Sequence, residues 1–409
     1  MKHLWILNHY AQEPKGAGGT RHFSLAKSLK NYGWNVSILA ASVEHHSGTQ
    51  RLHHEENQRI ESYENVVFLW VKTPVYAGNT IRRVLNIVTY LIQVIRPSVV
   101  VGLQRPNAIV GSSVHPLAAL AALILSRRYK VPFIFEVRDL WPQTLIDMGK
   151  LSERSFSATV LKKLERLLYK NAARIILLPP DAYKYVEALG ISSDRIASIP
   201  NGVDLSLFPP QSNDSLVKGS NFFTLMYFGS HGEANGLSNL IHAMKILQRD
   251  KIGSQIRLRL IGDGPRKLDL IKLAKDLKLS NVIFESPIPK NDIPAIASEA
   301  DAFVFNLIDS PVFNYGISSN KLFDFMASAR PIIFCCNSSN NPISEAGAGI
   351  TVKPGNPDDL ANGILAMAQL PTALRLEMGQ SAYRFIVKNH DFNYLAGQFA
   401  AVIEGAIKK

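Results

Sequence analysis

The chain of 409 residues contains only two cysteines, Cys335 and Cys336, which stand side by side in the apolar segment PIIFCCN. Adjacent cysteines seldom pair, and cysteines in a buried strand usually behave as small hydrophobic residues. This scarcity argues against a disulfide framework and predicts a reducing, cytoplasmic location. The histidines show no metal-ligand spacing with the cysteines, so the sequence also disfavours metal catalysis, and we expect no metal site.

Long apolar runs and acidic residues are also scarce. No apolar run is long enough to span a bilayer, and the start MKHLWILN lacks the pattern of a signal peptide. Basic residues outnumber acidic ones by 45 to 33, which gives a net charge of +12. Such a charge requires an anionic partner, which would be nucleic acid, nucleotide phosphate or an anionic membrane surface. The basic residues are dispersed and lack nucleic-acid motifs, which argues against nucleic acid.

The sequence does contain a regular alternation of strand-length apolar runs and amphipathic helical stretches. Near-continuous Val/Ile runs such as NVSILAA, NVVFLWV and SVVVGLQ with AIVGSS predict strands buried on both faces of a parallel sheet. The pattern restarts after the Pro-, Ser- and Asn-rich stretch 198–221. We therefore predict an α/β protein with two doubly wound Rossmann-like domains, residues 1–205 and 206–389, which face a central cleft. The final helix, about residues 390–409, could pack on either domain, and one expectation is that it returns to the first domain.

Glycine-rich loops follow predicted strands at three places. A strand, a glycine loop and a helix in this order bring backbone N–H groups close to an oxyanion such as a phosphate. The first loop does not match the Gly-x-Gly-x-x-Gly fingerprint of dinucleotide binding, so hydride transfer gains little support. Arg266 and Lys267, after the third loop, could face a nucleotide or lie on a solvated helix face, and we favour the solvated face. The loop glycines are Gly18 and Gly19, then Gly229 and Gly232, then Gly262 and Gly264.

In this order, the loops and the segments IPNGVDLSLF and SNKLFDFMASARPIIF resemble the family 4 glycosyltransferases of the two-domain GT-B architecture. The segments GSSVHPLAALAA and FIFEVRDLWPQTLIDMGKL are similar to the bacterial O-antigen and capsule subgroup that includes N-acetyl-fucosamine transferases. The resemblance implies transfer of an N-acetylated or 6-deoxy hexosamine from a UDP-sugar to a polyprenyl-diphosphate-linked saccharide, with retention of anomeric configuration. The UDP-sugar is then a substrate, and no cofactor is expected.

The resemblance also implies that the second domain binds the donor. In the family, a Glu-x7-Glu segment contacts the sugar with its first acid and the ribose hydroxyls with its second. Asp324 matches the second acid, whereas Gly316 stands where the first would fall. The sugar would therefore be contacted differently, by the backbone N–H groups of Ser318, Ser319 and Asn320 and by the cation Lys321.

The donor diphosphate presents a second departure from the family. An Arg and a Lys usually reach it from the first loop of the second domain, and these places fall near Ser230 or His231 and at Asn235. A leaving diphosphate needs positive charge or aimed N–H donors, so Lys321, the loop N–H groups and Arg138 are the remaining candidates. A lysine beside a helix N-terminus opposes the helix dipole, which favours a ligand for Lys321 over a plain surface role.

In the first domain, the segment FEVRDLWP places Glu136, Arg138 and Asp139 at the end of a predicted strand. Many relatives have a His-Asp pair near the reacting carbon here, and Arg138 stands in the place of the histidine. An arginine keeps neighbouring carboxylates ionised, which suits orienting an acceptor hydroxyl, although a structural ion pair is the alternative. His115 in SSVHPL is a second catalytic candidate or a scaffold residue. Glu136, with the first glycine loop, is assigned to acceptor and diphosphate binding.

The segment from Tyr76 to Ser98 is strongly apolar and contains three arginines and no acid. It predicts either a buried helix with arginines at its ends or an interfacial helix on an anionic leaflet. We favour the interfacial helix, which would place the protein at the cytoplasmic face of the inner membrane. Nucleotide-sugar 2-epimerases share the architecture and stay an alternative, and a basic nucleic-acid-binding module is a remote one.

Overall fold

The computed structural model describes residues 1–14, 20–45, 47–76, 78, 81–113, 115–209 and 222–408. Gly18 and Gly19 therefore lie outside the described residues. The chain forms two compact units. Unit 1 comprises Met1–Asn201, Tyr315–Ser318 and Phe392–Lys409, and unit 2 comprises Gly202–Asn314 and Ser319–Asp391.

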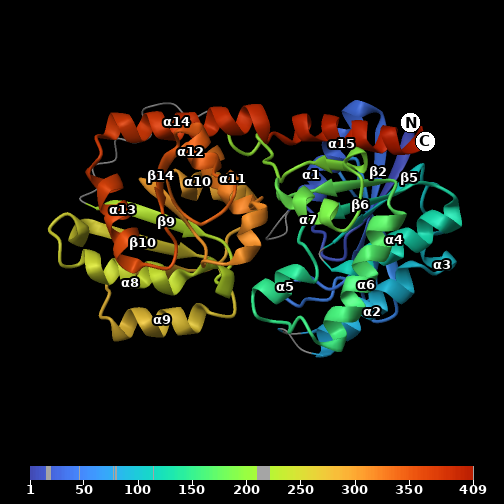
Figure 1. The fold of residues 1–409 in the computed structure, drawn as a ribbon, viewed down its shortest axis with the longest axis horizontal. Helices are drawn as coiled ribbons and strands as arrows, with labels where there is room; N and C mark the ends of the chain where they lie inside the picture. The colour runs from blue at the N-terminus through green and yellow to red at the C-terminus, as the bar shows by residue number, and fades with distance from the viewer. Residues whose placement is uncertain are drawn as a thin grey trace. The chain divides into compact units, whose positions relative to one another are not determined.

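Unit 1 contains an eight-stranded sheet with the order β3-β4-β2-β1-β5-β6-β7-β8 (Figure 1). Neighbouring strands are parallel, except for the antiparallel pair β3 and β4. The strands are β1 (Lys2–Leu7), β2 (Trp34–Ala41), β3 (Gln58–Tyr63), β4 (Val66–Val71), β5 (Ala108–Ser112), β6 (Phe133–Val137), β7 (Arg174–Leu177) and β8 (Ile196–Ser198). The helices are α1 (Arg21–Leu29), α2 (Ile81–Val94), α3 (Pro97–Val100), α4 (Pro116–Tyr129), α5 (Gln143–Asp147), α6 (Phe156–Asn171), α7 (Ala182–Ala188) and α15 (Phe392–Ile407).

Both faces of the unit 1 sheet are buried. Along β1, Leu4 and Ile6 join the core that α1 and α15 cover, whereas Trp5 and Leu7 join the core covered by α2, α4 and α6. A strand buried on both faces needs apolar residues at every position, which explains the uninterrupted runs of the sequence. The prediction of a doubly wound parallel sheet is confirmed.

Unit 2 contains a six-stranded parallel sheet with the order β11-β10-β9-β12-β13-β14. Helices α8 and α9 pack against each other, as do α11 and α14 (Figure 1). The strands are β9 (Phe223–Phe228), β10 (Ile256–Ile261), β11 (Val282–Glu285), β12 (Ala302–Asn306), β13 (Ile332–Cys335) and β14 (Gly349–Val352). The helices are α8 (Leu237–Leu247), α9 (Lys267–Asp276), α10 (Ile293–Ala297), α11 (Asn320–Ala327), α12 (Pro342–Ala346), α13 (Pro357–Gln369) and α14 (Thr372–Asn389).

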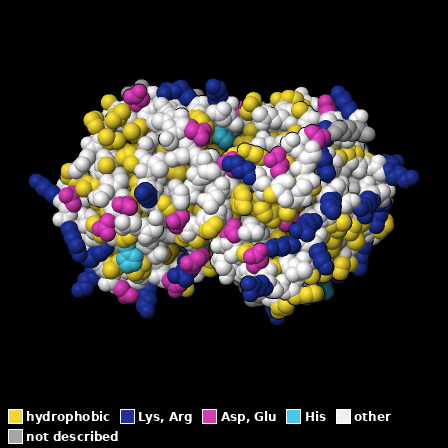
Figure 2. Space-filling view, viewed as in Figure 1, with side chains coloured by type: hydrophobic (Ala, Val, Ile, Leu, Met, Phe, Trp, Pro, Cys, Tyr) yellow, Lys and Arg dark blue, Asp and Glu magenta, His cyan; other side chains and the backbone are white. Residues whose placement is uncertain are grey.

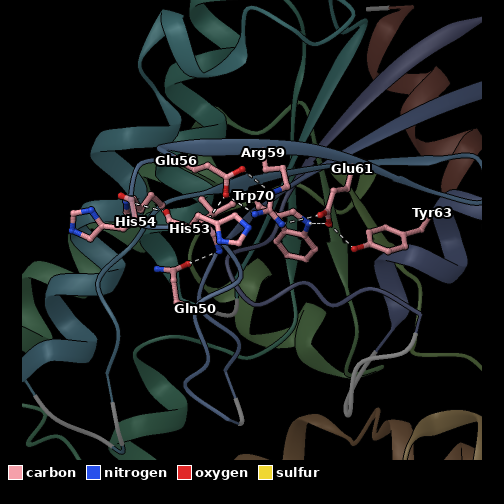
Figure 3. A network of polar contacts seen from close by, with 10 residues as sticks. Gln50, His53, His54, Glu56, Arg59, Glu61, Tyr63 and Trp70 are labelled. Carbon is pink, nitrogen blue, oxygen red and sulfur yellow. Dashed lines mark hydrogen bonds and ion pairs between the residues drawn. The ribbon is translucent and has the colours of Figure 1, made fainter.

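The edge strand β3 was not predicted, because its sequence QRIESY is mostly polar. Its side chains form a polar network with β4 (Figure 3). Arg59 bridges Glu56 and Glu61, and Glu61 also accepts hydrogen bonds from the Trp70 indole at 2.8 Å and the Tyr63 hydroxyl at 2.6 Å. Charged side chains on an edge strand hinder pairing with another chain, so β3 closes this side of the sheet.

One predicted strand is wrong. The run SVVVGLQ begins inside the short helix α3, whose first residue is Pro97. A proline at the first helical position is favourable, because its fixed φ suits the helix. It also lacks an N–H group, and an N–H at this position would have no hydrogen-bond partner within the helix. The strand of this region is β5 alone. Within the described parts of the chain, no helix combines the length and hydropathy that a transmembrane span requires.

Candidate functional site

The predicted donor residues follow the carboxyl ends of neighbouring parallel strands in unit 2, which is where ligands bind in doubly wound sheets. The glycine loops come after β9 and β10. A Cβ atom on Gly262, whose φ is +143°, would lie 2.0 Å from the carbonyl oxygen of Gly229. A Cβ atom on Gly264, at φ +156°, would lie within 2.8 Å of the His231 backbone. These two glycines therefore let the two loops touch backbone to backbone.

Hydrogen bonds join the same loops. The Gly229 N–H donates to the Ile261 carbonyl at 3.0 Å, and the His231 N–H donates to the Asp263 carbonyl at 2.8 Å. Lys267, predicted to lie on a solvated face, instead donates through Nζ to two main-chain carbonyls, at 2.7 and 2.8 Å. That prediction was wrong for Lys267, because its ammonium caps the ends of β10 and β11. Arg266 is exposed, and its Nη1 lies 3.4 Å from Glu233 Oε2. This surface ion pair is consistent with the predicted solvated face.

Lys321 lies in the first turn of α11 and reaches the loop after β9. Its ammonium donates to the Tyr227 hydroxyl at 3.0 Å and to Asn235 Oδ1, and lies over the rings of Tyr227 and Phe305. Among the described residues, no carboxylate lies within ion-pair distance of it. Burial lowers the pKa of Lys321 to about 7. The ammonium thus lies against position 235, where the family resemblance expected a lysine.

Asp324 lies one turn further along α11, with 4% of its surface exposed. Its Oδ2 accepts a hydrogen bond from Lys290 Nζ, whereas its buried Oδ1 finds no donor among the described residues. Burial raises the pKa of Asp324, and Lys290 opposes this effect. Sequence reasoning missed Lys290, because a lysine in the polar stretch PIPKND looks like any surface lysine.

The environment of His231 could not be predicted from its position in the sequence. The side chain is fully buried, and neither ring nitrogen has a hydrogen-bond partner among the described residues. Burial lowers its pKa to about 4, and the positive charges of Lys267 and Lys321 add to this effect, so the ring is neutral at pH 7. A buried polar ring without partners is costly, and a ligand that supplies a donor or an acceptor would offset that cost.

The start of α11 completes the unit 2 site. Ser319 is the N-cap residue and Asn320 the first helical residue. The Leu322 N–H donates to the Ser319 carbonyl at 3.1 Å, so the N–H groups of Asn320 and Lys321 are the ones that have no partner within the helix. Gly316 has φ +87°, a conformation that an acidic residue adopts only with strain. The backbone therefore gives a physical reason for the absence of the family's first acid.

In unit 1, Glu136 lies inside the protein rather than facing a ligand. It is fully buried in β6, and each carboxylate oxygen has its own partner. Arg21 Nε donates to Oε1 at 3.0 Å, and His22 Nε2 lies 2.5 Å from Oε2. Burial opposes ionisation of Glu136, but His22 and Arg21 outweigh it and lower the pKa. The expectation that Glu136 faces an open site is corrected: its contacts fix the start of α1.

His115 caps the N-terminus of α4 and belongs to a buried hydrogen-bonded chain. The Ala118 N–H donates to His115 Nδ1 at 3.3 Å, so the neutral ring carries its proton on Nε2 and donates to His9 Nδ1 at 2.8 Å. His9 in turn donates to Asn86 Oδ1 at 2.6 Å. Burial lowers the pKa of His115 to about 3 and that of His9 well below its usual value. His115 is thus engaged on both nitrogens by the protein.

Arg138 and Asp139 stand at the carboxyl end of β6. The Arg138 N–H donates to Ser113 Oγ at 3.0 Å, which ties this end to the loop after β5. Asp139 is exposed. Among the described residues, no group of three His, Cys, Asp or Glu side chains could hold a metal ion.

Two family models match the chain. Residues 16–202 match the "Glycosyl transferase 4-like domain" and residues 223–369 match "Glycosyl transferases group 1". The chain is 23% identical over 278 residues to the "Probable glycosyltransferase WbjE" of Pseudomonas aeruginosa, which covers 65% of this chain and 67% of the relative. It is 22% identical to the "Putative teichuronic acid biosynthesis glycosyltransferase TuaH" of Bacillus subtilis, over 49% of each chain.

Solved structures share the fold over the whole length. A sucrose-phosphate synthase from Thermosynechococcus elongatus superposes with a TM-score of 0.77 at 16% identity, covering 99% of this chain and 98% of the other. Anabaena Alr3699/HepE, solved in complex with UDP and glucose, gives a TM-score of 0.67 at 16% identity and covers 99% of both chains. With two family models on its two halves, the chain belongs to the glycosyltransferases of GT-B architecture.

Proposed function

We propose that this protein transfers a sugar from a UDP-sugar to a saccharide linked to polyprenyl diphosphate, in the synthesis of a bacterial surface polysaccharide such as O-antigen or capsule. The observation that carries the proposal is the Lys321 ammonium, which lies against Asn235 beside the N-terminus of α11. The complex of HepE with UDP and glucose and the teichuronic acid context of TuaH support the substrate classes. The motifs shared with N-acetyl-fucosamine transferases favour an N-acetylated or 6-deoxy hexosamine as the sugar.

In this proposal, unit 2 binds the donor. Lys321 and the unpaired N–H groups at the start of α11 hold the diphosphate, because a cation and a helix N-terminus both favour an oxyanion. The buried Oδ1 of Asp324, which has no donor among the described residues, accepts a hydrogen bond from a ribose hydroxyl. Lys290 donates to Oδ2, which orients the Asp324 carboxylate and favours its ionised form against the effect of burial. The two ring nitrogens of His231, which have no partner among the described residues, offer the donor a further hydrogen bond from the loop after β9.

The chemistry then needs no nucleophile from the protein. The bond between the anomeric carbon and the diphosphate oxygen breaks, and the acceptor hydroxyl attacks from the same face, so configuration is retained. The hydroxyl proton passes to the departing diphosphate. Lys321 stabilises the negative charge that develops there, and Asp139 and Arg138 orient the acceptor hydroxyl.

We also propose a peripheral location at the cytoplasmic face of the inner membrane. Figure 2 shows Lys and Arg side chains gathered over the part of unit 1 that Figure 1 labels α4 and α6. An anionic leaflet attracts such a surface, at about 1 kcal/mol per basic residue close to it.

A thermal-shift screen of UDP, GDP and their sugars tests the donor. A ligand present at 100 times its Kd stabilises the folded protein by about 2.7 kcal/mol, so UDP and one UDP-sugar should raise Tm and GDP should not. The same screen on the Lys321→Met variant should show a much smaller rise. Absence of any UDP-dependent shift in the wild type at millimolar concentration would contradict the proposal.

A further inference from the structure

The two groups that accept hydrogen bonds from the Lys321 ammonium are themselves oriented by the loop after β9. Tyr227 lies near the end of β9, and its hydroxyl donates to the carbonyl oxygen of Ser230 at 2.7 Å. A tyrosine hydroxyl has a single proton to donate. Because that proton is used on Ser230, the hydroxyl oxygen is left as an acceptor for the Lys321 ammonium, 3.0 Å away.

Asn235 is oriented by the same carbonyl. Its Nδ2 donates to the Ser230 oxygen at 2.7 Å, which turns its Oδ1 toward the Lys321 ammonium. The reverse orientation of the amide would bring its NH2 group against an ammonium, which has no acceptor. Asn306, the last residue of β12, fixes the backbone here, because its Nδ2 donates to the carbonyls of Asn235 and Gly236 at 2.8 and 2.9 Å. One backbone carbonyl, that of Ser230, therefore sets both acceptors.

The same loop leaves room for the lysine stem. A Cβ atom on Gly229 would lie 3.3 Å from Lys321 Cδ, which is closer than a Cβ atom usually packs, and its φ of +140° is rare for other residues. The ammonium lies 4.8 and 5.3 Å from the centres of the Tyr227 and Phe305 rings, which favour a cation. Space, rings and acceptors are thus all arranged around one side chain.

The arrangement holds the ammonium without cancelling its charge. An ammonium has three N–H donors. Two of them go to Tyr227 and Asn235, and the third has no acceptor among the described residues. Both acceptors are neutral, whereas a carboxylate in their place would compensate the positive charge. One N–H donor and the full charge therefore stay available for an anionic ligand.

We propose that Tyr227 and Asn235 are positioning residues for the transfer reaction, which hold the Lys321 ammonium at a fixed point with one N–H free for the donor diphosphate. They act through Lys321 and do not themselves bind the donor. This assignment rests on the proposed function for the identity of the ligand. The effect of the two side chains on Lys321 exists in the free protein as well and can be measured there.

The contribution of the diphosphate to binding tests the proposal. The ratio of the Kd for uridine to the Kd for UDP, measured by competition calorimetry, isolates this contribution, because uridine has the base and the ribose but no phosphate. Asn235→Ala should lower the ratio about tenfold, and Tyr227→Phe, which keeps the ring, about threefold. The Kd for uridine should stay within about twofold, whereas a loosened fold would weaken both ligands alike. Asn362→Ala, exposed on α13, is the matched control and should leave the ratio unchanged.

A double-mutant cycle separates positioning from direct contact with the donor. On the Lys321→Met background, Asn235→Ala should no longer change the ratio, because a residue that acts through the ammonium has no effect once the ammonium is gone. Full additivity of the two substitutions would overturn the proposal, since Asn235 would then contact the donor itself. Circular dichroism checks that each variant is folded.

A second measurement needs no ligand. Nuclear magnetic resonance of protein labelled at the lysine Cε carbons follows the titration of Lys321, whose signal is assigned from Lys321→Met. Burial lowers the pKa of Lys321 to about 7, and the two accepted hydrogen bonds favour its charged form. Asn235→Ala and Tyr227→Phe should therefore lower this pKa further, and Asn235→Asp, which adds a negative charge, should raise it. An unchanged pKa in all three variants would overturn the proposal.

The groups that face Lys321 keep their charge state over this titration. Burial raises the pKa of Tyr227, raises that of Cys336 to about 12 and lowers that of His231 to about 4. The change of charge around neutral pH is therefore that of Lys321 itself. Two carboxylates on the same elements have ion-pair partners: Asp324 with Lys290, and Glu233 with Arg266.

The outcomes separate this inference from the proposed function. If Lys321→Met lowers the ratio but neither Asn235→Ala nor Tyr227→Phe does so, the proposed function stands and the positioning role is wrong. If UDP does not bind at millimolar concentration, the proposed function fails, and the positioning role for the donor fails with it even where the pKa values shift as expected.

Discussion

The polar residues at the two sheet edges differ in how far the protein itself satisfies them. In unit 1, Glu136 has a partner on each oxygen and His115 has one on each nitrogen. In unit 2, the described residues supply no donor to one buried oxygen of Asp324, and they bind the Lys321 ammonium through a neutral hydroxyl and an amide oxygen. A saturated buried charge supports the fold, whereas an unsaturated one has capacity left for a ligand. The comparison therefore favours a structural role for Glu136 and supports the proposal that Lys321 and Asp324 bind a ligand.

The largest effect is expected for Glu136→Gln. The substitution keeps the size of the side chain but leaves the buried Arg21 without its counter-charge, which typically costs about 3–5 kcal/mol of unfolding free energy. Urea denaturation measures this loss, and the affinity of the remaining folded protein for UDP should stay within twofold. Unchanged stability together with lost UDP binding would reverse the roles that the comparison assigns.

Lys321→Met should affect activity almost as strongly. The variant keeps the apolar stem between the rings of Tyr227 and Phe305 but removes the ammonium, and loss of one such stabilising group lowers kcat by about 100- to 1,000-fold. Steady-state release of UDP from the donor measures the change. Lys272→Met, on the exposed face of α9, is the control and should keep full activity. A Lys321→Met enzyme as active as the control would remove Lys321 from the site.

Asp324→Asn should weaken UDP binding by about tenfold, which corresponds to about 1.4 kcal/mol. The asparagine side chain is neutral, so its ion pair with the Lys290 ammonium is lost. It also has one accepting oxygen where the carboxylate has two. Binding of UDP and 2′,3′-dideoxy-UDP, compared by calorimetry, isolates the ribose: the wild type should prefer UDP, and the variant should lose that preference. Asp292→Asn, at the end of the 3₁₀ turn that contains Lys290, serves as the control. A preference retained by Asp324→Asn would argue for a purely structural ion pair.

The last prediction concerns the dependence of UDP binding on pH. Burial lowers the pKa of Lys321 to about 7 in the free protein, and a bound diphosphate favours the charged form and raises that pKa. Above pH 7 the free lysine is mostly neutral, so binding takes up a proton, and the Kd for UDP should rise by up to tenfold per pH unit between pH 7 and 9. Below pH 7 the lysine is already charged and its contribution to the pH dependence disappears.

Lys321→Arg tests the cause of this pH dependence, because a guanidinium stays charged throughout the range. Its UDP affinity should be nearly flat from pH 7 to 9. A wild-type Kd that does not change over the same range would show that Lys321 is already charged in the free protein.

Much of the fold was predictable because its signals are local. The uninterrupted apolar runs of β2 and β4 indicated parallel strands buried on both faces, and the glycine loops correctly marked the carboxyl edge of unit 2. The failures have local causes as well. Strand β3 is polar because it lies at an edge, and the valines that seemed to begin another strand belong to α3, where Pro97 starts a helix.

The sequence by itself determined the architecture and the family, because periodicity and motifs can be read from the chain without its partners. It also predicted a donor segment around Lys321 and Asp324. Only the tertiary structure decided which charged groups are satisfied. The partners of Glu136 are 114 and 115 residues away, Lys290 is 34 residues from Asp324, and Asn235 is 86 residues from Lys321. These distant partners decide whether a buried charged group only supports the fold or can also bind a ligand. Only the folding of the chain brings such partners together.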